Sequence, residues 1–183
     1  MIDEIINDVV NKYEGRNERL IHIEGVVRKA LELGTKLNLD LEKLEIAAWY
    51  HDYTKYDDIE TQIAVLTEEQ IEAFKDTPIV FHALSAAEYL KIRHHITDDD
   101  ILNAIRFHVF GNPDMNIYAK VILLADKIED SRNYFMVEHF RKLAETSIDD
   151  AILNYLLDLK EMLKKDNKTI HPWMNELINK LGE

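Results

Sequence analysis

The sequence contains no cysteine, and this absence excludes several kinds of site. A chain without cysteine has no disulfide framework, no thiolate zinc site and no cysteine nucleophile. Any metal site must therefore use histidine, aspartate and glutamate, which suit iron, manganese, magnesium or zinc. Glycine and proline are also scarce, with five and three residues in a chain of 183, and no stretch is rich in both. We therefore expect no linker and one domain.

The sequence also lacks an excess of positive charge and any long apolar run. The formal net charge is −13, so the chain does not have the basic character that attracts nucleic acids or anionic membranes. No apolar run approaches the length of a membrane span, and the acidic start, MIDEIINDVVNKYEG, is unlike a signal peptide. These absences predict a cytoplasmic protein that binds neither nucleic acid nor membrane. A small phosphorylated ligand stays compatible, because a local metal cluster can reverse the field around it.

Apolar residues recur at three- and four-residue spacing along nearly every long segment, which is typical of amphipathic helices. No segment alternates with a two-residue period, so the predicted fold class is all-α. Helices are expected over 2–13, 18–37, 83–92, 98–108, 116–130, 137–146 and 148–165, with a last one beginning at 172. Asp40 is expected to cap a helix that enters the stretch IAAWYHD. Thr97, followed by Asp100, resembles an acidic capping box.

Four polar residues interrupt otherwise apolar helical sequence. His51 and Asp52 are adjacent at the end of one helical run, His22 lies on the preceding helix, and Asp126 follows five apolar residues in VILLADKIED. Successive helical residues diverge by about 100°, so the adjacent pair can address one metal or two only where the backbone turns. A buried carboxylate is costly unless it is paired or metal-bound. Each residue alone is compatible with a satisfied core position, but the ordered set H…HD…D indicates a metal site.

This order of residues resembles the HD-domain superfamily of metal-dependent phosphohydrolases. More narrowly, the chain resembles the YqeK family of bacterial HD proteins, which act as symmetrical bis(5′-nucleosyl)-tetraphosphatases. The matching blocks are RLIHIEGV (19–26), AAWYHDYTK (47–55), HALSAAEYL (82–90), AIRFHVFGNPDM (104–115) and KVILLADKIEDSR (120–132). The last two blocks are the most specific. The resemblance implies a single HD domain over 1–183, with a metal-site core over about 19–132 and C-terminal helices over 137–183. It also implies hydrolysis of a dinucleoside tetraphosphate to two nucleoside diphosphates.

The resemblance further implies a centre of two metal ions. His82 and His108 match histidines that give the family a second metal site. One ion would be held by His22, His51, Asp52 and Asp126, and the second by Asp52, His82 and His108. The family suggests a di-iron pair, and manganese is chemically close. His94, His95 and His139 match no family position and are expected to be solvated.

Cationic residues near these ligands match positions expected beside the nucleotide phosphates. Lys55 and Arg132 are the matching residues, and together with Asp52 they are expected to carry the chemistry. Arg19 lies one helical turn before His22 and therefore on the same face. Taken alone, each cation is more typical of a solvated surface position, and only the spacing from the metal ligands favours a phosphate role.

The C-terminal segment TIHPWMNELINK (169–180) resembles the closing segment of the family. It predicts nucleotide contacts from Thr169, Ile170, His171 and Trp173. The alternative is that Ile170 and Trp173 anchor this arm to the core. The sequence departs from the family pattern here and beside His108, at Val109, Phe110, Trp173 and Met174. These changes leave the metal ligands intact but affect the hydrogen bonds that the nucleotide would make.

Several alternatives stay open at the level of sequence. The H…HD…D pattern also suits other HD-domain nucleotidases and phosphodiesterases. Some HD proteins with extra histidines are di-iron oxygenases, and a non-catalytic nucleotide-binding protein would share the fold. The expected partner is a small nucleotide substrate, and a homodimer is compatible with the sequence.

Overall fold

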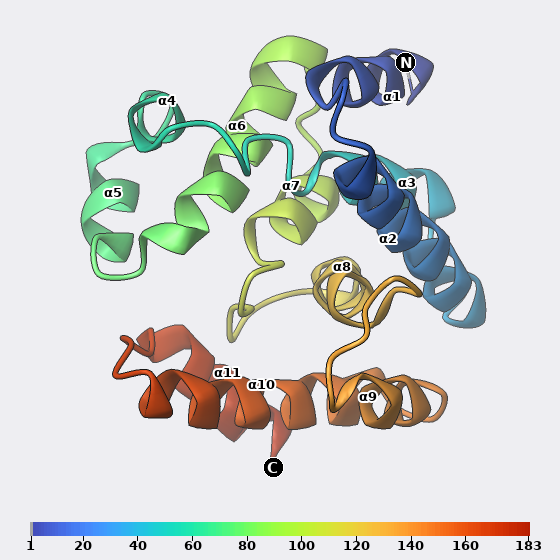
Figure 1. Cartoon of the computed structure of the whole chain (residues 1–183), viewed down its shortest axis with the longest axis vertical. Helices are drawn as coiled ribbons and strands as arrows, with labels where there is room; N and C mark the ends of the chain where they lie inside the picture. The colour runs from blue at the N-terminus through green and yellow to red at the C-terminus, as the bar shows by residue number, and fades with distance from the viewer. Residues whose placement is uncertain (1) are drawn as a thin grey trace.

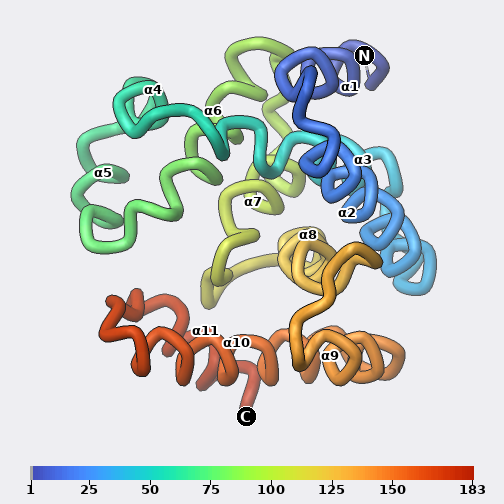
Figure 2. The backbone as a smooth tube through the Cα atoms, in the orientation of Figure 1, coloured from blue at the N-terminus to red at the C-terminus, as the bar shows by residue number. Residues whose placement is uncertain are grey.

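The computed structural model describes residues 2–183 and confirms the all-α fold class, because no β-strand occurs in that range. Figure 1 and Figure 2 show the course of the chain through eleven α-helices and one short 3-10 helix within the described residues. Their bounds are α1 (Ile2–Lys12), α2 (Asn17–Lys36), α3 (Leu41–Tyr50), α4 (Ile59–Ile63), α5 (Glu68–Phe74), η1 (Pro78–Val80), α6 (Phe81–His94), α7 (Asp99–Arg106), α8 (Ile117–Ile128), α9 (Val137–Ala144), α10 (Ile148–Lys165) and α11 (Pro172–Leu181). None of the helices over residues 2–183 is long and apolar enough to cross a membrane.

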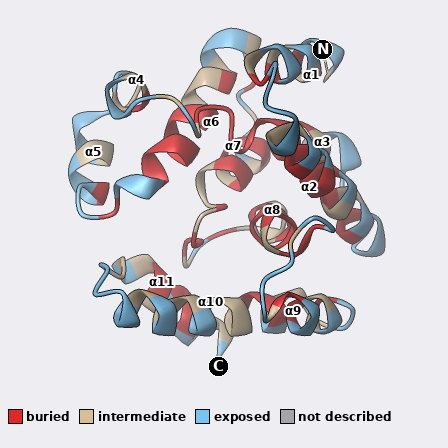
Figure 3. Ribbon diagram, viewed as in Figure 1, coloured by how far each residue is buried: buried red, intermediate tan, exposed pale blue. Residues whose placement is uncertain are grey.

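Helix α8 lies at the centre of the molecule. It packs against α2 and α3 on one side, against α7 on another and against α9 and α10, which form the lower layer in Figure 1. Its residues 121–125 are all fully buried, and a helix that is apolar nearly all round is stable only inside a core. Figure 3 shows the same burial on the facing parts of α2, α6 and α7. One continuous apolar core therefore surrounds the helix that carries Asp126.

Most of the predicted helix starts are confirmed, and one is wrong. Asp40 caps α3, since its side chain accepts hydrogen bonds from the backbone N–H groups of residues 42 and 43. Helix α7 is capped by Asp98 instead of Thr97. Asp98 has extended backbone angles, and its carboxylate accepts from the N–H groups of Asp100 and Ile101, so it satisfies the free donors that the predicted capping box would have served.

The segment between Asp58 and Val80 contains helices that the periodicity did not predict. Helices α4 and α5 span only five and seven residues, which is too short for an apolar stripe to repeat. The residues that cap these two helices were the only feature of the sequence from which the helices could have been predicted. Asp58 caps α4, and Thr67 with Gln70 forms a complete capping box at α5.

Helix α1 packs beside the turn that follows α3. The Tyr13 hydroxyl donates a hydrogen bond of 2.5 Å to the backbone carbonyl of Asp52. Asp8 accepts two hydrogen bonds from Arg93, at 2.8 and 2.9 Å, and His94 Nε2 lies 2.9 Å from the same carboxylate. The expectation that His94 is solvated is therefore wrong, because an acidic residue 86 positions away partners it. The other two histidines of that group, His95 and His139, are exposed as expected.

Candidate metal centre

The structure brings all six predicted metal ligands into one buried cluster. His51 ends α3, and Asp52 lies in the turn that follows, so the backbone does turn where the adjacent pair required it. The other four predicted ligands come from α2 (His22), α6 (His82), the turn after α7 (His108) and α8 (Asp126). Three overlapping groups have donor atoms within 4.8 Å of one another: His22–His51–Asp52, His51–His108–Asp126 and Asp52–His82–His108.

The two oxygens of Asp52 face different ligands. Oδ2 lies 3.4 Å from His51 Nε2 and 4.0 Å from His22 Nε2. Oδ1 lies 3.0 Å from His82 Nε2 and 3.2 Å from His108 Nε2. On the Oδ2 side, His22 Nε2 is also 3.1 Å from Asp126 Oδ1. This is the arrangement that a bridging carboxylate requires, with one oxygen for each ion of a pair.

Three of the histidines have the same tautomer fixed by the backbone. Each Nδ1 donates to the carbonyl oxygen three residues earlier: His51 to Ala48 at 2.6 Å, His108 to Ile105 at 2.7 Å, and His82 to Ile79. With the proton on Nδ1, each Nε2 presents a lone pair, which is the form that binds a metal. Burial also lowers the pKa of His108 to about 3, so this ring stays neutral.

The donor atoms fit a metal better than they fit one another. His51 Nε2 and Asp52 Oδ1 are buried and have no hydrogen-bond partner among residues 2–183. Although two Nε2 atoms approach Oδ1 within 3.2 Å, neither carries a proton to donate, and these two atoms are themselves 3.2 Å apart. Three lone pairs that converge at this distance repel unless a cation lies among them. The oxygen and nitrogen donors suit iron or manganese.

Cationic side chains surround the carboxylates. Arg19 contacts Asp52 Oδ2, Lys127 Nζ lies 2.5 Å from Asp126 Oδ2, and Arg132 Nη2 lies 2.7 Å from Asp126 Oδ1. Burial alone would raise the pKa of Asp126, but the neighbouring Lys127 ammonium holds it well below its usual range. Asp126 is therefore ionised. Lys127 was not predicted from the sequence, because a lysine next to a ligand on a helix is usually solvated.

Lys55 lies on the other side of the cluster. Its Nζ donates to His82 Nε2 at 3.2 Å and is 3.7 Å from Asp52 Oδ1. Burial lowers its pKa more than the nearby Asp52 raises it. The three predicted cations, Arg19, Lys55 and Arg132, thus all border the six-residue cluster.

A family model for the HD domain matches residues 19–130, a segment that contains all six clustered residues. The chain belongs to the HD-domain family. This confirms the family predicted from the order of its histidines and aspartates.

Two relatives of this chain are similar to it in length and share one name. The chain is 35% identical over 163 residues, 88% of each sequence, to the symmetrical bis(5′-nucleosyl)-tetraphosphatase of Bacillus subtilis (strain 168). It is 37% identical over 158 residues to the protein of the same name from Halalkalibacterium halodurans, covering 84% of this chain and 83% of the relative. A crystal structure from Clostridium acetobutylicum, described as a predicted HD superfamily hydrolase involved in NAD metabolism, superposes with a TM-score of 0.91 at 29% identity. The match covers 99% of this chain and 96% of the other.

A buried glutamate orients the His22 ring through its Nδ1 atom, on the side of the ring away from the cluster. His22 Nδ1 donates to Glu129 Oε1 at 3.0 Å, and Glu129 is fully buried. The backbone N–H and the hydroxyl of Ser131 donate to the same carboxylate at 2.7 and 2.6 Å. A Cβ atom on Gly25 would stand 2.3 Å from Glu129 Oε2, so this glycine of α2 leaves the space that the carboxylate occupies. Glu129 was missed in the sequence, although it lies three residues after Asp126.

We expect Glu129→Gln to weaken metal binding by about 10- to 100-fold, since partners that orient a ligating histidine typically contribute this much. Glutamine keeps the volume of the side chain and one carbonyl oxygen. It removes the negative charge that makes His22 Nε2 a stronger electron-pair donor to a metal. A competition titration against a coloured chelator measures the change. Glu138→Gln, at a side chain that is 80% exposed, is the matched control. Equal affinity in the two variants would contradict the role given to Glu129.

The C-terminal segment 169–180 packs on aromatic residues beside the cluster of six predicted ligands. Helix α11 begins at Pro172, as predicted, and His171 and Trp173 at its start contact an aromatic group. The ring centroids are 4.7 Å apart for Phe74–His171, 5.3 Å for Phe110–His171, 5.0 Å for Phe74–Trp173 and 6.0 Å for Phe107–Trp173. Thr169 is exposed and Ile170 is half-buried.

The positions where this chain departs from the family pattern therefore pack together. Phe110 stacks on His171, while Val109 and Trp173 line a small cavity of about 10 Å³, and Met174 is buried. These contacts give the arm a firm attachment next to His108. The nucleotide contacts expected from Thr169, Ile170, His171 and Trp173 stay a prediction.

Proposed function

We propose that this chain hydrolyses dinucleoside tetraphosphates, such as diadenosine tetraphosphate, to two nucleoside diphosphates. The observation that carries the proposal is the Asp52 carboxylate, whose two oxygens face two different sets of ligands. A pair of ions bridged in this way suits the in-line displacement at a phosphorus atom. Two relatives that are 35% and 37% identical and of similar length are named for this reaction, which supports the same substrate class.

The proposed ligand sets are those that the family resemblance implies, and all of their residues belong to the one cluster. His22, His51, Asp52 and Asp126 would hold one ion, and Asp52, His82 and His108 would hold the other. Bound metal supplies a hydroxide nucleophile near neutral pH and stabilises charge on the phosphoryl oxygens. We propose iron as the metal, with manganese as the chemically closest substitute.

The cationic side chains at the edge of the cluster are proposed to bind the phosphates of the substrate. The side chains of Lys55 and Arg132 are 32% and 36% exposed, so both reach solvent while touching the cluster. An arginine fork binds two phosphate oxygens at once, and a lysine acts as a point charge. We assign Arg132 and Lys55 to the phosphates, together with Arg19. Because the carboxylates they now contact are metal ligands in this proposal, metal loading leaves these cations available for the substrate.

Product analysis tests the proposal directly. The purified protein, loaded with iron or manganese, should convert diadenosine tetraphosphate to ADP alone, as measured by ion-exchange chromatography. A chelator added in excess should stop the reaction. Formation of AMP and ATP in equal amounts would show asymmetric cleavage and would overturn the symmetrical assignment.

A further inference from the structure

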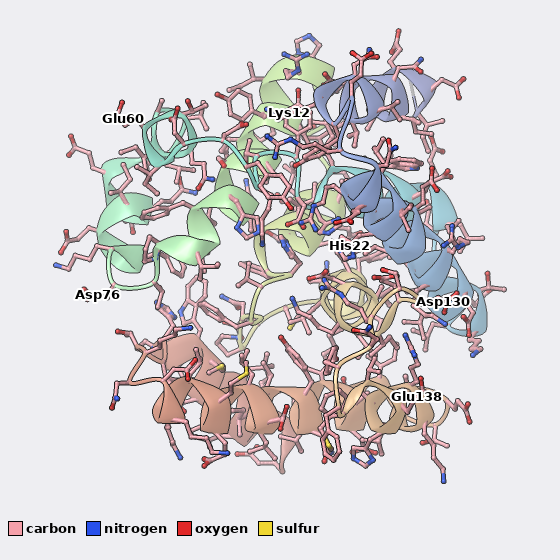
Figure 4. The ribbon with its side chains drawn as sticks, viewed as in Figure 1. Lys12, His22, Glu60, Asp76, Asp130 and Glu138 are labelled. Carbon is pink, nitrogen blue, oxygen red and sulfur yellow. The ribbon has the colours of Figure 1, made fainter. Side chains whose placement is uncertain are left out.

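Two hollows open from the cluster, one at each end. The first has a volume of about 400 Å³ and reaches His22, with Arg19, Tyr56, Arg132 and Tyr134 among its lining residues. The second has a volume of about 300 Å³ and reaches His82 and Lys55. His22 and His82 face different oxygens of Asp52, so the hollows lie on either side of the bridging carboxylate. Figure 4 shows His22 pointing into the middle of the molecule from α2.

The hollow beside His22 continues outward into another of about 470 Å³. The two share Glu18, Arg19 and Tyr56, and the outer one extends to Arg16. We call the joined space the outer groove. Each part falls in the size range of small-molecule sites.

The outer groove is basic although the protein is acidic. Among its lining residues, Arg16, Arg19 and Arg132 stand against the one carboxylate of Glu18. The whole chain has a formal net charge of −13. The overall negative field of the protein repels anions. A local cationic surface therefore attracts an anionic ligand to this one place on the molecule.

Aromatic rings line the same groove. Tyr56 is 55% exposed, and its ring centroid lies 4.6 Å from the Arg16 guanidinium carbon and 5.5 Å from that of Arg19. Tyr134 is 37% exposed, and its hydroxyl donates to the Lys127 carbonyl at 2.9 Å, which fixes its ring. Guanidinium groups bind phosphates, and tyrosine rings stack on bases of any sequence.

We infer that the outer groove holds one nucleoside diphosphate half of the substrate, with the other half on the Lys55 side of the cluster. The phosphates lie at Arg19 and Arg132, and the nucleoside lies between Tyr56 and Tyr134 with Arg16 at its outer end. The inference rests on the proposed function and adds a reason for the substrate class. A molecule with a nucleoside at each end of a phosphate chain occupies both hollows, whereas a molecule with one nucleoside occupies only one.

The test compares two ligands that differ by one nucleoside. Diadenosine tetraphosphate has two adenosines, and adenosine 5′-tetraphosphate has one. We expect Tyr56→Ala and Arg16→Gln each to lower kcat/KM for the first substrate relative to the second by about tenfold, since one base stack contributes this much. Arg28→Gln, at an exposed arginine on α2, the helix that Arg16 precedes, should leave the ratio unchanged. Thermal melting confirms that each variant is folded.

A binding measurement tests the groove assignment independently of whether the protein hydrolyses the substrate. The affinities of methylene-bridged, non-hydrolysable forms of both ligands, measured by calorimetry, should change in the same ratio. Equal losses for both ligands, or no loss for either, would overturn the inference even if ADP is the only product. If the wild-type protein forms no ADP but the binding ratio still falls in both groove variants, the proposed reaction fails while the groove assignment holds.

Discussion

Replacing Asp52 by alanine should abolish hydrolysis and remove most of the bound metal. Each oxygen of Asp52 faces its own group of ligands, so one substitution affects both proposed ions. Metal ions at such centres contribute several kcal/mol to transition-state stabilisation, and a loss of about 4 kcal/mol lowers the rate roughly a thousandfold. Elemental analysis by mass spectrometry and a rate assay with diadenosine tetraphosphate measure the two effects.

Two further variants separate the carboxylate's role from its place in the core. Asp52→Asn keeps the shape of the side chain and should lose metal to a similar degree, because the amide has no charge to balance the ions. Asp149→Ala removes a half-exposed aspartate, which pairs with Lys120 at 2.7 Å, and should change neither measurement. Full metal content with full activity in Asp52→Ala would show that the carboxylate does not bridge two ions.

Replacing His82 or His108 by alanine should remove one metal equivalent per chain and leave the other. Both histidines lie close to Asp52 Oδ1, at 3.0 and 3.2 Å, whereas His22 faces Oδ2 and lies 3.1 Å from Asp126 Oδ1. A centre reduced to one ion loses the clamp on the second phosphoryl oxygen, so we expect the rate to fall by roughly a hundredfold or more. Metal counting by mass spectrometry decides the stoichiometry.

The controls for this experiment are histidines away from the cluster. His95→Ala and His139→Ala both change exposed side chains and should bind metal normally. His94 is unsuitable, because it partners Asp8 and its loss would disturb the attachment of α1. Unchanged metal content in both His82→Ala and His108→Ala would assign these residues to phosphate contacts or to structure.

The sequence singled out four of the six clustered residues because their pattern is local, whereas His82 and His108 came from the family resemblance. His51 and Asp52 are adjacent, and His22 and Asp126 each stand out in apolar helical sequence. The long helices were predictable for the same reason, since an apolar stripe repeats several times along each. Helices as short as α4 leave no room for such a repeat.

The residues that support the ligands could not be predicted, because their contacts join distant parts of the chain. Glu129 meets His22 across 107 positions, and Gly25 matters only for the space it leaves beside that carboxylate. Nothing in the local sequence of Lys127 distinguishes a buried counterion from a surface charge. Such roles are set by the packing of α2 against α8, which periodicity alone does not give.

The hydrogen bond from Tyr13 to the Asp52 carbonyl connects the cluster to a residue that lies before the segment matched by the HD family model. The family match begins at residue 19, yet the backbone carbonyl of Asp52 accepts a hydrogen bond from Tyr13, the residue that directly follows α1. Ile5 and Val9 of the same helix are fully buried in the common core. A fragment cut at the edge of the family match would keep every ligand and lose the contact that fixes the turn between His51 and the residues after it. The geometry of the six-residue cluster thus also depends on residues outside the segment that the family model matches.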